Sequence, residues 1–214
     1  MAEAALTHPP VKTVVFDLGG VVLDWDPRHL YRKVFDDQAA VEQFLTTVCT
    51  LEWHAQHDQG RPMDETLPRL CDEHPHLATE ISLWRERYIE MVAGYIEGMV
   101  EVLDELDRVG VPRYALSNMP AEVLPELRQA FPVLEVFDGM IVSGQEQLAK
   151  PEPAIFRLLT ERFGLEPAET VFVDDVPANV DAAWTLGFRG IRFESAHQLR
   201  RVLAAWGLPV SVAP

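Results

Sequence analysis

Short apolar runs alternate with amphipathic stretches along the chain. The first run, VVFDLGGVVLDWD (residues 14–26), leads through β-branched residues to a carboxylate, Asp17, and then to two glycines. Four later segments have the same apolar character: PRYALS (112–117), GMIVSG (139–144), TVFVDD (170–175) and GFRGIRF (187–193). Continuous apolar runs of this length are typical of strands that are buried on both faces of a sheet.

Helical patterns separate these strands. The segments PAEVLPELRQAF (120–131) and PANVDAAWTLG (177–187) begin with a proline at a first-turn position, and PAIFRLLTERFG (153–164) ends on a glycine. Proline at the start and glycine at the end are the usual boundaries of a helix. The alternation predicts an α/β fold, a Rossmann-like parallel sheet with helices on both faces.

The alternation stops between the first strand and the second. Asp26 and Pro27 predict a helix start, and the helical stretches LYRKVF (30–35), VEQFLTTV (41–48) and ISLWRERYIEMVAGYI (81–96) follow. No linker rich in Pro, Gly or Ser marks the joins, so a separate domain on a flexible tether is disfavoured. We expect a small inserted α-helical cap, residues 27–96, over a catalytic core formed by residues 1–26 and 97–214.

Polar residues stand at the ends of the apolar strands. They are Asp17 after the first strand, Ser117 and Asn118 after the second, Lys150 before a later helix, and Asp174 and Asp175 after the fourth. Each one alone is better explained as a turn or helix-cap residue. Because the carboxyl ends of parallel strands share one edge of the sheet, the whole set predicts a site there.

The residue types indicate the chemistry. Carboxylates held close together repel one another unless a cation lies between them, and oxygen ligands favour Mg²⁺. A lysine and a Ser-Asn pair are suited to binding the remaining oxygens of an anion. A metal, a lysine and a hydroxyl around a nucleophilic carboxylate predict phosphoryl transfer through an aspartyl-phosphate.

Charge and composition narrow the partners. The chain has 34 acidic and 18 basic residues, a net charge of −16, and 48% of its 214 residues are hydrophobic. We therefore expect no nucleic-acid partner, and an anionic substrate needs a local metal or lysine. No apolar stretch reaches membrane-spanning length, and the start MAEAALTHPPVK lacks the pattern of a secretory leader. Cys49 and Cys71 are expected to be free thiols in a cytoplasmic protein, monomeric or homodimeric.

Four motifs resemble those of the haloacid dehalogenase-like superfamily: FDLGG, LSN, KP and VFVDDVPAN, in that order. The resemblance covers about two-thirds of the chain. The helical insertion is similar to the small cap of that superfamily. The segment EWHAQHDQGRPMDE (52–65) resembles the subgroup that contains bacterial α-D-glucose-1-phosphate phosphatases and the phosphatase domain of soluble epoxide hydrolases.

The resemblance implies a role for each residue at the strand ends. It makes Asp17 the nucleophile and a metal ligand, the Gly19 carbonyl and Asp175 further Mg²⁺ ligands, and Asp174 a helper through water. It also implies that Ser117 and Asn118 hold the phosphoryl group while Lys150 neutralises it and orients the nucleophile.

Gly19 departs from most phosphatases of the superfamily, which have a second aspartate there as the general acid. Its loss usually costs ~10²–10⁴-fold in rate. Either the leaving group needs little protonation, as in a sugar 1-phosphate, or a neighbour such as Asp24, Asp26 or a cap histidine donates the proton. Alternatively, the protein is a metal-independent 2-haloacid dehalogenase, although such enzymes lack the acidic pair, or a scaffold without activity.

Trp53 and His57 lie four residues apart, on one face of a predicted helix. They are either core residues of the cap or a substrate wall, in which an aromatic ring stacks on a sugar while a histidine or Asp58 bonds to hydroxyls. Trp25 is expected to extend this wall. Together these observations predict a Mg²⁺-dependent phosphatase acting on a small phosphorylated metabolite, with sugar phosphates as the expected class.

Overall fold

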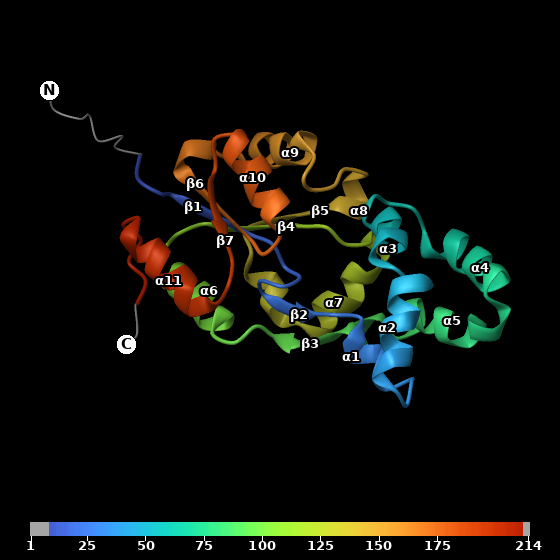
Figure 1. Cartoon of the computed structure of the whole chain (residues 1–214). Coiled ribbons are helices and arrows are strands. Elements are labelled where there is room, and N and C mark those ends of the chain that lie inside the picture. The colour runs from blue at the N-terminus through green and yellow to red at the C-terminus, as the bar shows by residue number, and fades with distance from the viewer. Residues whose placement is uncertain (1–8, 212–214) are drawn as a thin grey trace, which may run out of the picture.

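The computed structural model describes residues 9–211, and a parallel sheet runs through its larger part (Figure 1). The strand order is β5-β4-β1-β6-β7. The strands are β1 Thr13–Phe16, β4 Arg113–Ser117, β5 Gly139–Val142, β6 Thr170–Asp174 and β7 Arg189–Arg192. In the register of the sheet, Val15 of β1 pairs with Tyr114 on one side and Phe172 on the other. The parallel sheet expected from the apolar runs is confirmed.

Helices cover both faces of the sheet. They are α6 Met99–Arg108, α7 Leu124–Ala130, α9 Pro153–Phe163, α10 Pro177–Thr185 and α11 Ala196–Ala205. In β1, Val15 packs with buried residues of α9 and α10, whereas Val14 and Phe16 belong to the core that contains residues of α6, α7 and α11. Both faces are therefore dry, which is why the strands are apolar throughout.

The insertion after β1 is helical, as expected. It contains α1 Arg28–Tyr31, α2 Gln38–Thr47, α3 Leu51–Asp58, α4 Met63–Glu73 and α5 Ala78–Glu86. Asp26 accepts a hydrogen bond from the Arg28 N–H at 2.8 Å, so the predicted helix start is found. In Figure 1 these helices lie together at one end of the sheet, beside the short helix α8 Ser143–Glu146.

The long helix expected over residues 81–96 is wrong. Helix α5 ends at Glu86, and the 3₁₀ helix η2 Tyr88–Met91 and strand β3 Val92–Tyr95 follow it. Strand β3 pairs antiparallel with β2 Leu23–Trp25, a strand that the sequence did not reveal. Gly94, with φ +150°, lies outside helical geometry. The pairing joins segments about seventy residues apart, so local periodicity carries no signal for it.

The end of α3 packs directly on α8. A Cβ atom at Gly60, where φ is +91°, would lie 2.9 Å from the Gly144 carbonyl oxygen. Gly144 has no space of its own, since a Cβ there would lie 2.6 Å from the Ala121 nitrogen. These two glycines allow backbones to approach closely, and they fix the last turn of α3 relative to the sheet.

Three further expectations concern features away from the sheet. Cys49 and Cys71 are free thiols, as expected. Within residues 9–211, no helix combines the length and the apolar character needed to cross a bilayer. The expectation that the start of the chain is not a secretory leader concerns residues 1–12, of which residues 1–8 lie outside the described part of the chain.

Candidate active site

The polar residues at the strand ends meet at one edge of the sheet. Asp17 follows β1, Ser117 ends β4 and Asp174 ends β6. One oxygen from each of Asp17, Asp174 and Asp175 lies within 4.8 Å of the others. The convergence predicted from parallel strands is therefore found, although 158 positions separate the outermost two carboxylates.

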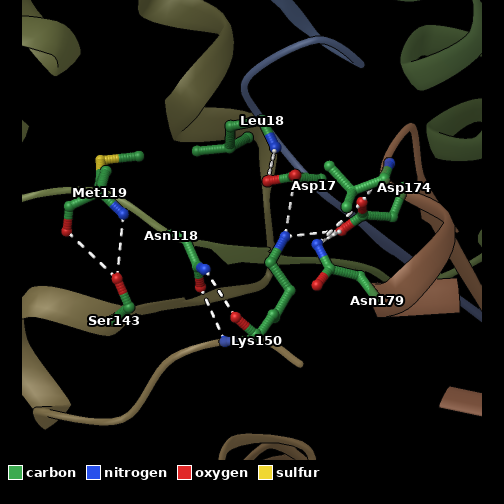
Figure 2. A network of polar contacts seen from close by, with 9 residues as sticks. Asp17, Leu18, Asn118, Met119, Ser143, Lys150, Asp174 and Asn179 are labelled. Carbon is green, nitrogen blue, oxygen red and sulfur yellow. Dashed lines mark hydrogen bonds and ion pairs between the residues drawn. The ribbon is translucent and has the colours of Figure 1, made fainter. Parts of the chain in front are cut away.

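Lys150 is the cation at the centre of this cluster (Figure 2). Its fully buried Nζ lies 2.9 Å from Asp17 Oδ2 and 2.7 Å from Asp174 Oδ2. Burial by itself would lower the pKa of Lys150, but the charges of the two carboxylates outweigh it and the net pKa is raised. The lysine therefore stays charged, and it holds one oxygen of Asp17 in place.

Opposing effects act on the pKa of Asp17. Burial raises its pKa to about 7, the Lys150 ammonium opposes the rise, and the charge of Asp174 adds to it. The Leu18 N–H donates to Asp17 Oδ1 at 2.7 Å (Figure 2). A further cation beside Asp17 would favour its ionised form, the form that a nucleophile requires.

Asp174 differs from its neighbour because its oxygens are already engaged. Oδ1 accepts from the Val176 N–H at 2.9 Å, and Asn179 Nδ2 donates to both oxygens at 3.0 and 3.1 Å. With Lys150 on Oδ2, this carboxylate anchors the lysine (Figure 2). Asn179 is a positioning residue that we did not assign from the sequence, although it ends the VPAN part of a motif.

Asp175 is half-buried and borders the cavity. Its carboxylate lies against Gly20, whose φ is +74° and where a Cβ would come within 2.6 Å of Asp175 Oδ2. Gly20 is therefore the glycine that the turn requires, both for its backbone conformation and for space. At Gly19 the backbone is not left-handed, and a Cβ would meet only the Trp25 Cβ at 3.8 Å.

The donor set at this edge fits a hard divalent cation. Each oxygen of Asp17 has one protein partner and keeps room for another, and no hydrogen bond among the described residues ends on the Gly19 carbonyl. Asp175 adds a carboxylate beside Asp17. Carboxylate and carbonyl oxygens with room for water match the preferences of Mg²⁺.

The side chain of Asn118 is hydrogen-bonded to the backbone of Lys150, and Asn118 also lines the cavity. Its Nδ2 donates to the Lys150 carbonyl oxygen, and its Oδ1 accepts from the Lys150 N–H, both at 2.9 Å (Figure 2). We expected this amide to hold the phosphoryl group; here it holds the lysine loop. Ser117, which is buried and lines the cavity, has the place expected for a phosphoryl contact.

A cavity of about 410 Å³ opens above the cluster. Its floor includes Asp17, Gly19, Ser117, Lys150 and Asp175. Its wall carries residues from the β2–β3 ribbon, from α3 and from the core, namely Leu23, Trp25, Leu51, His54, Asp58, Tyr88, Val92, Met119, Leu127 and Val176. The reactive groups therefore face a partly open cavity whose wall carries both apolar and polar side chains.

Comparison with known proteins agrees with this geometry. A model of the haloacid dehalogenase-like hydrolases matches residues 11–187. The chain belongs to the haloacid dehalogenase-like hydrolase family. The resemblance found in the four sequence motifs is thereby confirmed for the superfamily, while the narrower likeness to sugar-phosphate members stays a prediction.

Among similar proteins, this haloacid dehalogenase-like chain is 28% identical over 184 residues to a sesquiterpene phosphatase of Aspergillus oryzae, covering 84% of this chain and 88% of the relative. It is 24% identical to a phosphorylated carbohydrates phosphatase of Thermotoga maritima, covering 85% and 84% of the two chains. These relatives act, by their names, on chemically different phosphate esters.

A haloacid dehalogenase-family enzyme from Bacteroides thetaiotaomicron has a similar structure, with a TM-score of 0.70 and 24% identity over 91% of this chain and 98% of the other. The same enzyme was solved in complex with magnesium and inorganic phosphate, where the TM-score is 0.65 at 22% identity over 86% and 95% of the chains. At this identity the likeness establishes the fold alone.

Trp53 and His57 lie outside the cavity of this family member, so the substrate wall expected from them is wrong. Their rings do share one helix face and pack at 4.6 Å. That face turns inward: His57 is fully buried, with Nε2 at 2.6 Å from Thr66 Oγ1, and Trp53 packs against Trp84 at 5.4 Å. Spacing indicates that two residues share a face, but not what that face contacts.

The face of α3 that lines the cavity carries Leu51, His54 and Asp58. These positions follow the three- and four-residue spacing of one helical stripe. Asp58 and Trp25 were candidates for the wall from the sequence, and both line it. Tyr88 was missed, because it belongs to the segment that we expected to be one long helix.

Proposed function

We propose that the chain is a Mg²⁺-dependent phosphatase that hydrolyses a small phosphorylated metabolite through an aspartyl-phosphate. The observation that carries the proposal is the buried ion-pair chain in which Lys150 Nζ contacts Asp17 at 2.9 Å and Asp174 at 2.7 Å. Asp175 lies at the same edge and completes a set of three carboxylates. A structural ion pair alone does not require a third carboxylate beside a cavity.

Each residue has a task in this proposal. One Asp17 oxygen attacks phosphorus while Lys150 holds the other, and the lysine charge offsets that of the bound phosphoryl group. Asp174 and Asn118 keep the lysine at the floor, and Ser117 contacts a phosphoryl oxygen. Mg²⁺, held by Asp17, Asp175 and the Gly19 carbonyl, would supply charge neutralisation.

We take residues 27–96 as a cap over this floor. The last turn of its helix α3 rests on α8 through Gly60 and Gly144, and its face with Leu51, His54 and Asp58 closes the cavity. Excluding bulk water strengthens the electrostatic interactions below it. The cap therefore also supplies the part of the wall that selects the leaving group.

The wall favours a leaving group whose body is mostly apolar. Besides the floor residues, the cavity is lined by the apolar residues Leu18, Leu23, Leu51, Val92, Met119, Leu127 and Val176, and by Trp25, His54, Asp58, Tyr88, Asn118 and Asn179. Leu51 and Val176 are 59% and 44% exposed, so they offer apolar surface beside the cavity. The Aspergillus relative is a sesquiterpene phosphatase by name. This likeness supports an isoprenoid or aryl phosphate over a sugar phosphate as the substrate of this chain.

A metal-independent dehalogenase is the runner-up among enzymes, and it leaves Asp175 unexplained. The test is phosphate release from sugar phosphates, isoprenoid phosphates and aryl phosphates, with Mg²⁺ and after EDTA, with 2-chloropropionate as the dehalogenase substrate. We expect Mg²⁺-dependent release, faster from the apolar esters. Release unaffected by EDTA, or halide release with no phosphate release, would overturn the proposal.

A further inference from the structure

The site has no proton donor at Gly19, so the leaving oxygen must be protonated from elsewhere. In an in-line displacement that oxygen departs on the side opposite the attacking Asp17, which is the side of the cavity wall. Of the carboxyl groups that line the cavity, Asp17 and Asp175 belong to the floor and Asp58 to the wall. Resting on the proposed phosphatase activity, we propose that Asp58 is the general acid that protonates the leaving-group oxygen.

The position of Asp58 supports this role. It is the last residue of α3, and its side chain is only 16% exposed. Its Oδ1 atom is buried and has no hydrogen-bond partner in the described part of the chain. A buried carboxylate oxygen without a partner is costly, and this cost favours the neutral, protonated form of Asp58.

His54 lies beside this carboxyl group. Trp84 Nε1 donates to His54 Nδ1 at 3.2 Å, so the proton of the neutral ring is on Nε2. That Nε2 atom lies 3.5 Å from Asp58 Oδ1. Burial lowers the pKa of His54 to about 3, which leaves the ring neutral at physiological pH and unsuited to donate the proton itself. His54 is therefore a neighbour of the proposed acid and not the acid itself.

The surroundings of Asp58 favour its protonated form. Burial raises its pKa to about 7, the negative charge of Asp17 adds to the rise, and Lys150 opposes it. Tyr88 of η2 also faces it, and burial keeps that phenol protonated by raising its pKa. Burial, the largest of these causes, does not depend on the charge at the floor.

Of the donors that the sequence raised, His54 lines the cavity but has a neutral ring, and Asp24, Asp26 and His57 do not line it. Asp24 lies 3.1 Å from His29 Nε2, with a side chain that is 46% exposed. Asp26 accepts from the Arg28 N–H and lies 3.3 Å from its guanidinium. His57 is enclosed in the cap. Asp58 is the acid that remains.

The proton balance closes over one turnover. As the Asp17–phosphorus bond forms and the phosphorus–oxygen ester bond breaks, the departing oxygen takes the Asp58 proton and leaves as an alcohol. The Asp58 carboxylate then accepts a proton from the water that attacks the aspartyl-phosphate. Phosphate is released, Asp17 is regenerated and Asp58 is protonated again.

The test compares wild type, Asp58→Asn and the control Asp24→Asn on aryl phosphates whose leaving groups range from nitrophenols to unsubstituted phenol. For Asp58→Asn we expect a loss of about 10²–10⁴-fold in kcat/KM with the most basic leaving group and little loss with the most acidic, hence a steeper dependence on leaving-group pKa. Asp24→Asn should follow wild type. A uniform loss across the series, or an unchanged slope, would overturn the role of Asp58.

A double variant gives a second readout. The backbone at Gly19 tolerates a side chain, so Gly19→Asp combined with Asp58→Asn places an acid at the floor. We expect this double variant to recover a shallow dependence on leaving-group pKa, and a slope as steep as that of Asp58→Asn would count against proton donation. If wild type hydrolyses no phosphate ester, the proposed phosphatase function fails, and the assignment of Asp58 fails with it. If wild type is active and Asp58→Asn shows the same dependence on leaving-group pKa, only the assignment of Asp58 fails and the phosphatase function stands.

Discussion

Asn118 and Lys150 exchange two hydrogen bonds. The Asn118 amide nitrogen donates to the Lys150 carbonyl oxygen and its amide oxygen accepts from the Lys150 N–H, each at 2.9 Å. The asparagine thus mimics a strand neighbour and holds the backbone of the residue whose Nζ bridges two carboxylates. The geometry of the floor depends on this pair, although they stand 32 positions apart.

Replacing Asn118 by Ala should loosen the lysine loop. We expect the loss of two hydrogen bonds to lower the free energy of unfolding by about 1–3 kcal/mol. We also expect kcat/KM to fall by about 10–10²-fold, because misplaced catalytic groups lose orientation. Urea denaturation and steady-state kinetics measure both. The control is Gln198→Ala, which removes the hydrogen bond that the Gln198 side chain donates to the Arg192 carbonyl oxygen. This variant should keep the activity.

Asp17→Asn should keep the fold and abolish turnover, since a neutral amide cannot form the acyl-phosphate. Beryllofluoride with Mg²⁺ should raise the melting temperature of wild type by binding at Asp17 and should leave that of the variant unchanged. Differential scanning fluorimetry with and without fluoride checks this. Equal shifts in the two proteins would contradict the role of Asp17.

Gly60→Ala should cost both stability and activity. Its positive φ and its approach to the Gly144 carbonyl oxygen leave no room for a methyl group, so the last turn of α3 must move. We expect about 2–4 kcal/mol of destabilisation, combining backbone strain with a steric clash, and slower turnover.

Gly110→Ala is the matched control. Gly110 has φ +70°, but a Cβ there meets nothing within 4 Å. This variant should show the conformational cost alone, about 1–2 kcal/mol, with unchanged turnover. If the two variants lost equal stability and equal activity, the contact between α3 and α8 would not position the wall.

His54 should make the fold sensitive to acid. Its folded-state pKa is lowered to about 3, mainly by burial, from 6.5. The unfolded chain therefore binds more protons between these values, and stability is lost as pH falls from about 6.5 toward 3. We expect on the order of 1 kcal/mol per pH unit within this window from this residue. His54→Asn should flatten the stability curve, whereas exposed His76→Asn should not; identical curves would contradict the assignment.

Asp58 should have the opposite effect on the pH dependence of stability. Its folded-state pKa is raised from 3.8 to about 7, mainly by burial, so the folded state binds the extra proton and stability falls as pH rises from about 4 to 7. Asp58→Asn removes that penalty. The variant should gain about 1–3 kcal/mol relative to wild type at pH 8 and little at pH 4. Chemical denaturation at the two pH values measures the difference, and an equal effect at both would argue for a structural role.

The sequence by itself determined the parallel sheet and the edge at which its polar residues gather. Continuous apolar runs are stable as strands of a sheet that is covered on both faces. The carboxyl ends of parallel strands share one edge of that sheet. For that reason the sequence alone predicts that Asp17, Ser117 and Asp174 lie at one site. The motifs around Lys150 and Asp175 carried the same information.

Only the tertiary structure decided how these residues divide the work. In the folded chain Asp174 contacts Lys150, whereas Asp175 lies beside Gly20. The Asn118 amide is hydrogen-bonded to the backbone of Lys150. The tertiary structure also turned Trp53 into the cap and Asp58 toward the cavity. Local patterns show which residues share a face or follow a strand. What a side chain contacts depends on segments that pack from far along the chain, and no local period encodes that packing.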